Sequence, residues 1–420
     1  MKTRSIRGFK DILPDTIKRW HHIENVAKET FERYGYGEIR IPEIEFTNLF
    51  ARSIGTTTDI VKKEMYTFTD LDGSSITLRP EGTAGVVRAF IEHSMHLKSP
   101  VTKLYYTGTM FRHERPQKGR YRGFNQIGAE YFGSAVPYAD VEIISMLWNF
   151  LKKIGLSQKL QLEISSLGDE SSRPAYMELL VEYFTSHADA LCPDCRRRLE
   201  TNPLRILDCK KEACTQIVNG APSILDSLRA ESREHFDTVK NGLTLLSIPF
   251  VLNPRIVRGL DYYTRTVFEI TTDQLGAQNS VAAGGRYDGL VENLGGVSTP
   301  AIGFALGMER LILLHEIQFP GGFSKEIDAF VAHIGDQPRQ KAFMIAHILR
   351  ENGMRVEIDY EAKSLKSQLK RANKLGVKLT LIIGEDELKK GTVIIRDMEL
   401  SEEKEMDIER VKDLAFEFSS

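Results

Sequence analysis

Cysteine is scarce in this chain, because only four are present among 420 residues and all of them lie between positions 192 and 214. Such a cluster does not match the disulfide framework of a secreted protein. Long apolar runs are also missing, since no segment approaches the roughly 18 residues of a membrane helix. The charged first ten residues contain no apolar stretch typical of a secretory signal. These absences predict a globular protein of the cytoplasm with no membrane partner.

An excess of positive charge is missing as well. The formal net charge is -2 at pH 7, which argues against a wholly basic nucleic-acid-binding protein. Any RNA contact must therefore come from local basic surfaces. The hydrophobic content, 41%, is sufficient for ordinary folded cores. A chain of this length is expected to form two or three domains.

The segment from residue 105 to residue 130 carries most of the functional information. It reads as an apolar strand, a charged loop and a second strand, which predicts a hairpin. Each guanidinium group in the loop can donate two parallel hydrogen bonds to the oxygens of one phosphate. Phe124 offers a flat face for a purine, and Gln126 and Glu130 share its side of the strand at period 2. The alternative is a solvated, charge-rich hairpin. The basic residues of the loop are Arg112, Arg115, Lys118, Arg120 and Arg122.

A second hairpin is predicted shortly before this segment. Residues 65–70 and 75–80 have strand character, and the pair Asp72-Gly73 between them favours a tight turn. Glu81 and Thr83 follow, beside small residues that permit close approach of the backbone. A carboxylate and a hydroxyl at this spacing could hold an ammonium group. The alternative is that Thr83 caps the start of a helix.

Two further segments carry candidate binding residues. Arg258, Tyr262 and Tyr263 lie close together before a strand expected at residues 266–270. Buried tyrosine hydroxyls require partners, which an imidazole or a ribose could supply. The alternative is two tyrosines packed in a sheet beside a surface arginine. Arg310 follows an expected strand and lies in a helix, where an arginine is usually solvated.

These segments together resemble the class II aminoacyl-tRNA synthetases. Residues 111–124, with Phe-Arg-His-Glu before the variable loop and Arg-Tyr-Arg-Gly-Phe after it, resemble the second motif of that class. Residues 301–314 resemble the third motif. A helix expected at residues 15–34 and a strand at residues 39–45, which contains Pro42, resemble the first motif, which forms a dimer interface in the class. An ordinary surface edge strand is the alternative reading of the first motif.

The resemblance narrows to the histidyl-tRNA synthetase family at three further segments. Arg-Pro-Glu-Gly-Thr at residues 79–83 is similar to the segment with which that family holds the α-amino group. Arg-Gly-Leu-Asp-Tyr-Tyr at residues 258–263 is similar to its histidine-specific signature. Residues 282–290 are similar to its glycine-rich segment. The resemblance covers nearly the whole chain, with the motifs in the order typical of the family.

The resemblance implies an α/β (α+β) fold. Its core would be the antiparallel-sheet catalytic domain of class II synthetases at residues 1–325, interrupted by a mainly helical insertion at residues 168–240. A C-terminal α/β anticodon-binding domain would follow at residues 326–420. The pattern of that last part favours strands and helices in alternation. The strands are expected at residues 328–334, 355–359, 378–383 and 392–396, and the helices at residues 338–352 and 362–375.

The resemblance also implies a role for each candidate residue. The expected catalytic cations at the α-phosphate of ATP are Arg112 and Arg258. The expected histidine-binding residues are Glu81, Thr83, Gln126, Glu130, Arg258, Tyr262 and Tyr263. The expected ATP-binding residues are Arg112, Glu114, Arg120, Phe124 and Arg310. Mg2+ is expected to accompany the phosphates. Contacts to tRNA are expected from Arg115, Gln117, Lys363, Lys366 and Lys370.

The lysines of the expected helix at 362–375 form a stripe. Lys363, Lys366, Lys370 and Lys374 lie at offsets 0, 3, 7 and 11, which places them on one helical face. A phosphate backbone would meet such a face favourably. The alternative is a stripe that only keeps the surface solvated.

The four cysteines leave the presence of a metal open. Cys192, Cys195, Cys209 and Cys214 are separated by two, thirteen and four residues. This pattern is similar to a four-thiolate zinc site. The alternative is a set of reduced thiols packed between helices. No metal ligand is assigned from the sequence.

The predicted function is the ATP-dependent attachment of histidine to the 3′ end of its tRNA, through a histidyl-adenylate, by a homodimer. One alternative is a non-enzymatic paralogue of the same fold that senses histidine and regulates ATP phosphoribosyltransferase. Such paralogues generally lack the C-terminal domain, whereas this chain continues past residue 326. A second alternative is an RNA-binding module without catalysis, which would leave the amino-acid pocket unexplained.

Overall fold

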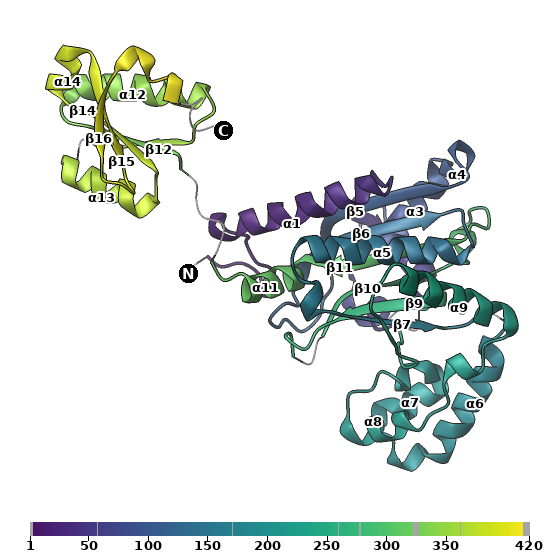
Figure 1. Cartoon of the computed structure of the whole chain (residues 1–420). Helices are drawn as coiled ribbons and strands as arrows, with labels where there is room; N and C mark the ends of the chain where they lie inside the picture. Colours follow the sequence, from purple (N-terminus) through teal and green to yellow (C-terminus); the bar gives the residue numbers. More distant parts are fainter. Residues whose placement is uncertain are drawn as a thin grey trace. The chain divides into compact units, whose positions relative to one another are not determined.

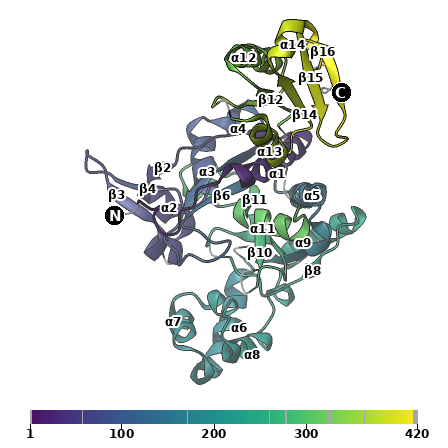
Figure 2. The ribbon, with the colours of Figure 1, turned by 90° about the vertical axis from the view of Figure 1, so that its left-hand side faces the viewer.

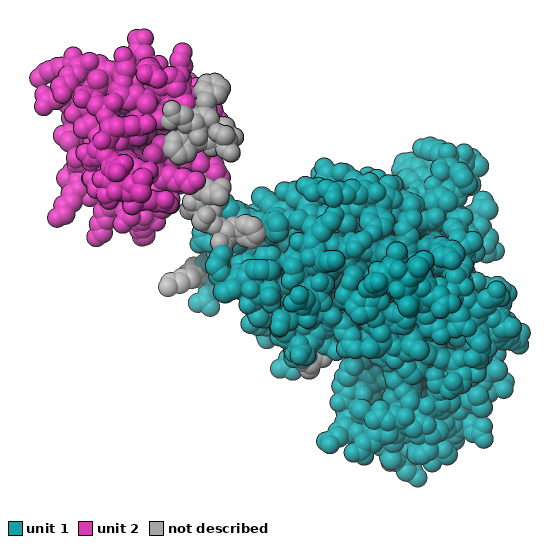
Figure 3. Space-filling view, viewed as in Figure 1, with its two compact units in different colours: residues 1–322 teal, residues 323–420 magenta. Residues whose placement is uncertain are grey.

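A computed structural model of the chain describes residues 3–56, 58–169, 171–258, 260–276, 279–321, 327–361 and 363–414. It divides into two compact units, residues 1–322 and residues 323–420 (Figure 3). The boundary expected between residues 325 and 326 lies outside the described residues. Within the described part of the chain, every helix is too short or too polar to cross a membrane.

The first unit is built on an eight-stranded sheet. All neighbouring strands are antiparallel except the outer pairs β1·β5 and β7·β8, which are parallel. This antiparallel core confirms the expected fold class. In sheet order the strands are β1 (Gly37–Glu38), β5 (Thr102–Phe111), β6 (Gly123–Phe132), β11 (Ala301–Gly307), β10 (Ser280–Arg286), β9 (Thr264–Thr271), β7 (Gln161–Ser166) and β8 (Val251–Leu252).

Four helices pack along one face of this sheet and enclose the main core (Figure 1). They are α1 (Pro14–Arg33), α5 (Pro137–Lys153), α9 (Ala230–Leu245) and α11 (Met308–Gln318). Each contributes buried apolar residues, such as Phe31 of α1 and Phe150 of α5. Ile127 and Ala129 of β6 lie in the same core. Because side chains alternate along a strand, the residues at even positions of β6 face the other side of the sheet.

The other face of the sheet carries a second buried cluster, which contains Val86 and Phe90 of α3 (Thr83–Glu92) and Tyr106 of β5. A small three-stranded sheet precedes α3 in the chain, and its order is β2 (Ile44–Phe46), β4 (Ser75–Leu78) and β3 (Tyr66–Thr69). The second predicted hairpin, β3 and β4, is therefore confirmed. Two short helices, α2 (Thr47–Ile54) and α4 (Met95–Lys98), complete this region.

The strand expected at residues 39–45 is only partly present. Strand β1 ends at Glu38 and β2 begins at Ile44. Between them the backbone does not join a sheet ladder. Pro42 explains the interruption, because proline has no N–H group to donate to a neighbouring strand.

A helical body is inserted between β7 and α9. It contains α6 (Arg173–Ser186), α7 (Pro193–Thr201) and α8 (Glu212–Asn219), which gather apart from the sheet in both views of the ribbon (Figure 1, Figure 2). This body has its own small core, which includes Leu180 and Phe184. Helix α9 starts within the range expected for the insertion, yet Phe236 and Val239 of α9 belong to the main core.

The second unit is a five-stranded sheet covered by helices on both faces. In sheet order its strands are β13 (Val356–Ile358), β12 (Ala329–His333), β14 (Leu379–Ile383), β15 (Thr392–Asp397) and β16 (Glu403–Asp407). Helices α12 (Asp336–Glu351) and α13 (Leu365–Leu375) bury their apolar faces in two separate clusters. The four predicted strands and two predicted helices are present. Strand β16 and the short helix α14 (Glu385–Lys390) were not predicted.

Candidate active site

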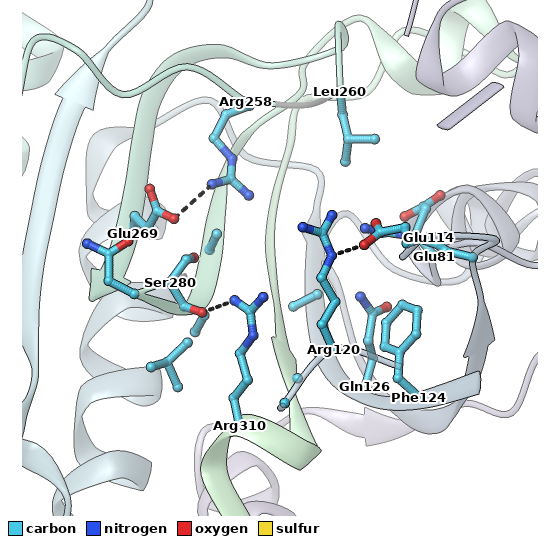
Figure 4. Close-up of a pocket in the computed structure, with 18 of the residues that line it drawn as sticks. Glu81, Glu114, Arg120, Phe124, Gln126, Arg258, Leu260, Glu269, Ser280 and Arg310 are labelled. Atoms are coloured by element: carbon cyan, nitrogen blue, oxygen red, sulfur yellow. Dashed lines mark hydrogen bonds and ion pairs between the residues drawn. The ribbon is translucent and has the colours of Figure 1, made fainter. Parts of the chain in front are cut away.

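A pocket of about 430 Å3 opens on the face of the eight-stranded sheet opposite the main helices (Figure 4). Phe124 and Gln126 of β6 line it, together with Glu269 of β9 and Ala305 of β11. The pocket brings together eleven of the residues predicted from the sequence. They are Glu81, Thr83, Arg112, Glu114, Arg120, Phe124, Gln126, Arg258, Tyr262, Tyr263 and Arg310.

Arg120 and Arg310 line one part of the pocket. The guanidinium of Arg120 forms an ion pair with the carboxylate of Glu114, and Arg310 Nη1 donates a hydrogen bond to the carbonyl oxygen of Ser280 (Figure 4). Burial lowers the pKa of both guanidinium groups, and the charge of Arg120 lowers the pKa of Arg310 further. The two positive charges repel each other, so an anion bound beside them would stabilise both charged side chains.

Arg112 is fixed at the end of β5 by backbone and aromatic contacts. Its Nε donates a hydrogen bond of 2.8 Å to the carbonyl oxygen of Pro80. Its guanidinium lies 5.3 Å from the ring centroid of Phe124, within the range of a cation–π contact. Burial lowers the pKa of Arg112, and the nearby charge of Arg258 contributes in the same direction. The side chain is therefore a pre-oriented cation at the pocket.

Arg258 faces the pocket from the loop before β9. Its Nη1 lies 3.9 Å from Glu269 Oε1 (Figure 4), and its guanidinium lies 5.6 Å from the ring centroid of Tyr263. Its Nε is buried and has no hydrogen-bond partner among the described residues. A buried donor without a partner is rare in folded proteins and is typical of a site that a ligand completes. The sequence also predicts a bend at Arg258-Gly259, but Gly259 lies outside the described residues.

The start of α3 supplies a buried carboxylate. Glu81 Oε2 accepts a hydrogen bond of 2.8 Å from the backbone N–H of Thr83, and Glu81 Oε1 accepts one of 2.9 Å from the N–H of Ala84. Glu81, not Thr83, therefore caps this helix. Burial raises the pKa of Glu81. Its oxygens have further acceptor sites, so an ammonium group in the pocket could still bind there.

A second buried carboxyl group lies behind Thr83. Thr83 Oγ1 donates a hydrogen bond of 2.7 Å to Glu130 Oε1, and the Tyr287 hydroxyl donates one to Glu130 Oε2. Glu130 is completely buried. Burial raises its pKa to about 8, although both hydrogen bonds act to lower it. Glu130 does not line the pocket, but its hydrogen bond from Thr83 connects it to a residue that does.

Aromatic and amide groups complete this end of the pocket. The rings of Tyr262 and Tyr263 have centroids 4.7 Å apart and are tilted by 49°. Burial raises the pKa of both hydroxyls, which are therefore neutral donors at pH 7. Gln126 is 8% exposed, and its Oε1 has no hydrogen-bond partner among the described residues. These groups could bind a planar ligand that has both a donor and an acceptor, such as an imidazole.

The residues predicted to contact tRNA lie outside this pocket. Arg115 and Gln117 are exposed on the loop between β5 and β6. Gln117 and Arg120 exchange backbone hydrogen bonds of 3.0 Å across a turn in which Gly119 has φ +75°, a conformation that favours glycine. The predicted lysine stripe belongs to the second unit. Helix α13 begins at Leu365, so Lys363 precedes the helix and the stripe is shorter than predicted.

Several pocket residues were missed by sequence reasoning. Glu269 lies between Phe268 and Ile270, which are buried, so strand alternation alone could have indicated its direction. Glu309 also lines the pocket, where its Oε1 accepts hydrogen bonds of 2.9 and 3.1 Å from the backbone and side chain of Asn125. No local pattern indicates this contact, because the two residues are 184 positions apart.

Four guanidinium groups thus share one pocket with the buried carboxyl group of Glu81 and with tyrosine hydroxyls. Such cations can stabilise negative charge on a phosphate while the other groups hold a small zwitterionic substrate. On an antiparallel sheet of this topology, the arrangement defines a class II aminoacyl-tRNA synthetase.

Comparison with known proteins gives the particular family. A family model described as histidyl-tRNA synthetase matches residues 8–168 and 207–311, and one described as anticodon binding domain matches residues 328–415. The chain belongs to the histidyl-tRNA synthetase family. A protein of Trichlorobacter lovleyi named histidine–tRNA ligase is 52% identical over 398 residues, which cover 95% of this chain and 94% of that one.

Solved structures agree with this assignment. The chain is similar to the apo histidyl-tRNA synthetase of S. aureus, with a TM-score of 0.82, 38% identity and coverage of 100% of both chains. It also shares its fold with a Bacillus halodurans C protein described as an ATP phosphoribosyltransferase regulatory subunit/histidyl-tRNA synthetase, with a TM-score of 0.66. That match has 21% identity and covers 91% of this chain and 98% of the other.

Proposed function

We propose that this chain attaches histidine to the 3′ end of its cognate tRNA in two steps at the pocket described above. In the first step an oxygen of the histidine carboxylate attacks the α-phosphorus of ATP. The bond to the β-phosphate oxygen breaks, pyrophosphate leaves, and histidyl-adenylate forms. In the second step the terminal ribose hydroxyl of the tRNA attacks the histidyl carbonyl carbon and AMP leaves. The match to histidine–tRNA ligases over nearly the whole chain supports this assignment.

Arg112 and Arg258 are the proposed catalytic cations. Negative charge increases on the α-phosphate oxygens as the carboxylate attacks, and two oriented guanidinium groups stabilise that charge. The fixed position of Arg112 over Phe124 and the unpartnered Nε of Arg258 support these roles. Neither residue has to form a covalent bond, because the attacking group comes from the substrate.

The remaining arginines are proposed to bind ATP. Arg120 and Arg310 hold the outer phosphates, and Arg310 also contacts adenine, which stacks against Phe124. Glu114 keeps Arg120 in place through their ion pair. Mg2+ would accompany the nucleotide and neutralise part of the charge on its phosphates. Oxygen ligands suit this ion, and the pocket offers the carboxylates of Glu269 and Glu309.

The other end of the pocket is proposed to select histidine. Glu81 and Thr83 hold the α-amino group, while Gln126, Tyr262 and Tyr263 surround the imidazole. Glu130 supports this end through its hydrogen bond from Thr83. An apolar amino acid would leave these buried polar groups without partners, which disfavours its binding.

We further propose a domain assignment for each part of the chain and a set of residues that contact tRNA. Residues 1–325 form the catalytic domain, residues 168–240 its insertion, and residues 326–420 the anticodon-binding domain. Arg115 and Gln117 contact the acceptor end of tRNA, and Lys363, Lys366 and Lys370 contact its phosphate backbone.

Assembly and location are proposed on the same basis. The exposed apolar side chains Ile44 and Phe46, which are 46% and 61% exposed, lie in the region of the first class II motif and support a homodimer. The protein is proposed to work in the cytoplasm, with its tRNA substrate.

The observation that carries the proposal is the presence of Arg112, Arg258 and the two tyrosines in one pocket. Transfer of labelled histidine to unmodified tRNA transcripts tests it. We expect stable labelling of histidine tRNA and none of a tRNA for another amino acid. If histidine binds but no tRNA is labelled, the chain is instead a histidine-binding regulator of the same fold.

A further inference from the structure

The four cysteines of the chain meet within the helical body. Their Sγ atoms all lie within 4.8 Å of one another, and all four are free thiols. Cys192 immediately precedes α7 and Cys195 lies in the first turn of that helix. Cys209 lies in the loop before α8, and Cys214 lies within α8. Sulfur atoms from three separate stretches of the helical body therefore lie close together.

We propose that these four thiolates bind one structural zinc ion. A tetrahedral zinc ion with Zn–S distances of about 2.3 Å places its sulfur ligands about 3.8 Å apart. The largest separation between sulfur atoms in this cluster exceeds that value by no more than about 1 Å. A purely thiolate ligand set also selects zinc over harder ions such as Mg2+.

The surroundings of the cluster fit a closed structural site. Cys195 and Cys214 are fully buried, and Cys192 and Cys209 are partly buried. The backbone N–H of Cys192 donates a hydrogen bond of 3.2 Å to Cys214 Sγ. Such N–H···S contacts stabilise the negative charge that a thiolate carries. With four sulfur ligands the ion has no open position, so the site would hold the fold together without taking part in catalysis.

The helical body needs such a cross-link more than the rest of the chain. Helices α7 and α8 contain only nine and eight residues, lengths at which an isolated helix is marginal in water. The core beneath them is much smaller than the main core of the first unit, and two of the cysteines are among its buried residues. Small cores of this kind are commonly stabilised by a metal or by disulfides.

The cysteine cluster adjoins the active-site pocket. Asp208 and Lys210, the two neighbours of Cys209, both line that pocket. Zinc bound to Cys209 would hold this turn, and with it Asp208 and Lys210, at the pocket. The zinc proposal itself does not depend on the proposed ligase activity, because its tests measure metal and structure.

The direct test is the metal content of the full chain, purified without a tag and without chelators. We expect about one zinc ion per chain. Replacement by Co2+ should give the intense charge-transfer and visible absorption of a tetrahedral tetrathiolate site. After denaturation without reductant, in the presence of a chelator, all four thiols should react with a thiol reagent. A folded chain that contains four reactive thiols and no zinc, or one in which the cysteines are oxidised to disulfides, would overturn the proposal.

Two substitutions at one position provide a matched comparison. Cys192→Ser removes a ligand, whereas Cys192→His replaces it with another zinc ligand. We expect the serine variant to lose zinc to a competing chelator at a lower concentration than the wild-type chain. The histidine variant should retain zinc better than the serine variant.

Hydrogen exchange provides a readout independent of metal analysis. In the serine variant, amides of residues 192–219 should lose protection while those of β5 and β6 keep it. Equal zinc retention and equal protection in the wild-type chain and both variants would show that Cys192 is not a ligand, which contradicts a four-thiolate site.

Discussion

Thr83 donates a hydrogen bond of 2.7 Å from its hydroxyl to Glu130, which joins the first residue of α3 to the last part of β6. The same carboxyl group accepts a hydrogen bond from Tyr287, so a buried network connects three distant parts of the chain. Through Thr83 this network reaches the pocket without exposing Glu130. The position of Thr83, and with it the proposed ammonium site, therefore depends on Glu130.

Glu130 should make the stability of the protein depend on pH. Its pKa in the folded chain is about 8, against an ordinary value of 4.5. Between these values the folded state binds a proton that the unfolded state has released. The free energy of unfolding therefore falls as the pH rises from about 4.5 to about 8. Glu130→Gln keeps the shape of the side chain and cannot ionise, so its stability should fall less over this range.

Urea denaturation at intervals from pH 5 to pH 9 measures this effect. Glu29→Gln, on the exposed surface of α1, is the control and should keep the pH dependence of the wild-type chain. An identical pH dependence in the wild-type chain and in Glu130→Gln would mean that Glu130 does not take up a proton in this range.

Arg258→Ala should abolish most of the adenylation activity. Removal of one oriented group that stabilises transition-state charge commonly costs about 100- to 1,000-fold in rate. We expect a loss of this size in the kcat of histidine-dependent pyrophosphate exchange, with tRNA binding largely kept. Arg410→Ala is the control, because Arg410 is 72% exposed and belongs to the second unit. Unchanged exchange in Arg258→Ala would remove this residue from the mechanism.

Gln126→Leu should weaken histidine binding. The buried Oε1 of Gln126 has no hydrogen-bond partner among the described residues, so histidine is the proposed partner. Leucine has a similar size and cannot accept a hydrogen bond, and the lost interaction is expected to raise KM for histidine by about 10-fold. KM for ATP should change little. The control is Gln158→Leu at an exposed position. If KM for histidine stays at the wild-type value, the imidazole is bound elsewhere.

The double variant Lys366→Glu/Lys370→Glu should weaken tRNA binding. Both residues are exposed on α13. The logarithm of tRNA affinity falls linearly as the logarithm of the salt concentration rises. Each lost phosphate contact should make this slope less negative by roughly one. Pyrophosphate exchange should stay unchanged, because that reaction does not use tRNA. Lys389→Glu on α14 reverses charge elsewhere in the same unit and is the control. Equal tRNA affinities for the double variant and the wild-type chain would exclude this face as a binding surface.

The sequence predicted those features that depend on local periodicity. Residues Ile127 and Ala129 of β6 enter the main core while Gln126 faces the pocket, as alternation along a strand requires. The helix expected at residues 15–34 is present as α1, in which the apolar residues Trp20, Ile23 and Ala27 are buried at helical spacing. Both predictions rest on neighbours within one element.

Features that depend on distant contacts could not be predicted in this way. Tyr287 and Glu130 are 157 positions apart, and no pattern around either residue indicates their hydrogen bond. Strand β16, Glu-Lys-Glu-Met-Asp, lies at the edge of its sheet and lacks apolar alternation. Its place in the sheet is set by backbone pairing with β15. The convergence of the four cysteines likewise depends on how the helical body folds.

The most direct test of the proposed function is the exchange of labelled pyrophosphate into ATP, with histidine and each other standard amino acid offered separately. We predict exchange with histidine and only background exchange with the others, because the buried polar groups of the pocket are left unpaired by other side chains. The absence of exchange with histidine, in protein that is folded and binds ATP, would contradict the proposal that this pocket forms histidyl-adenylate.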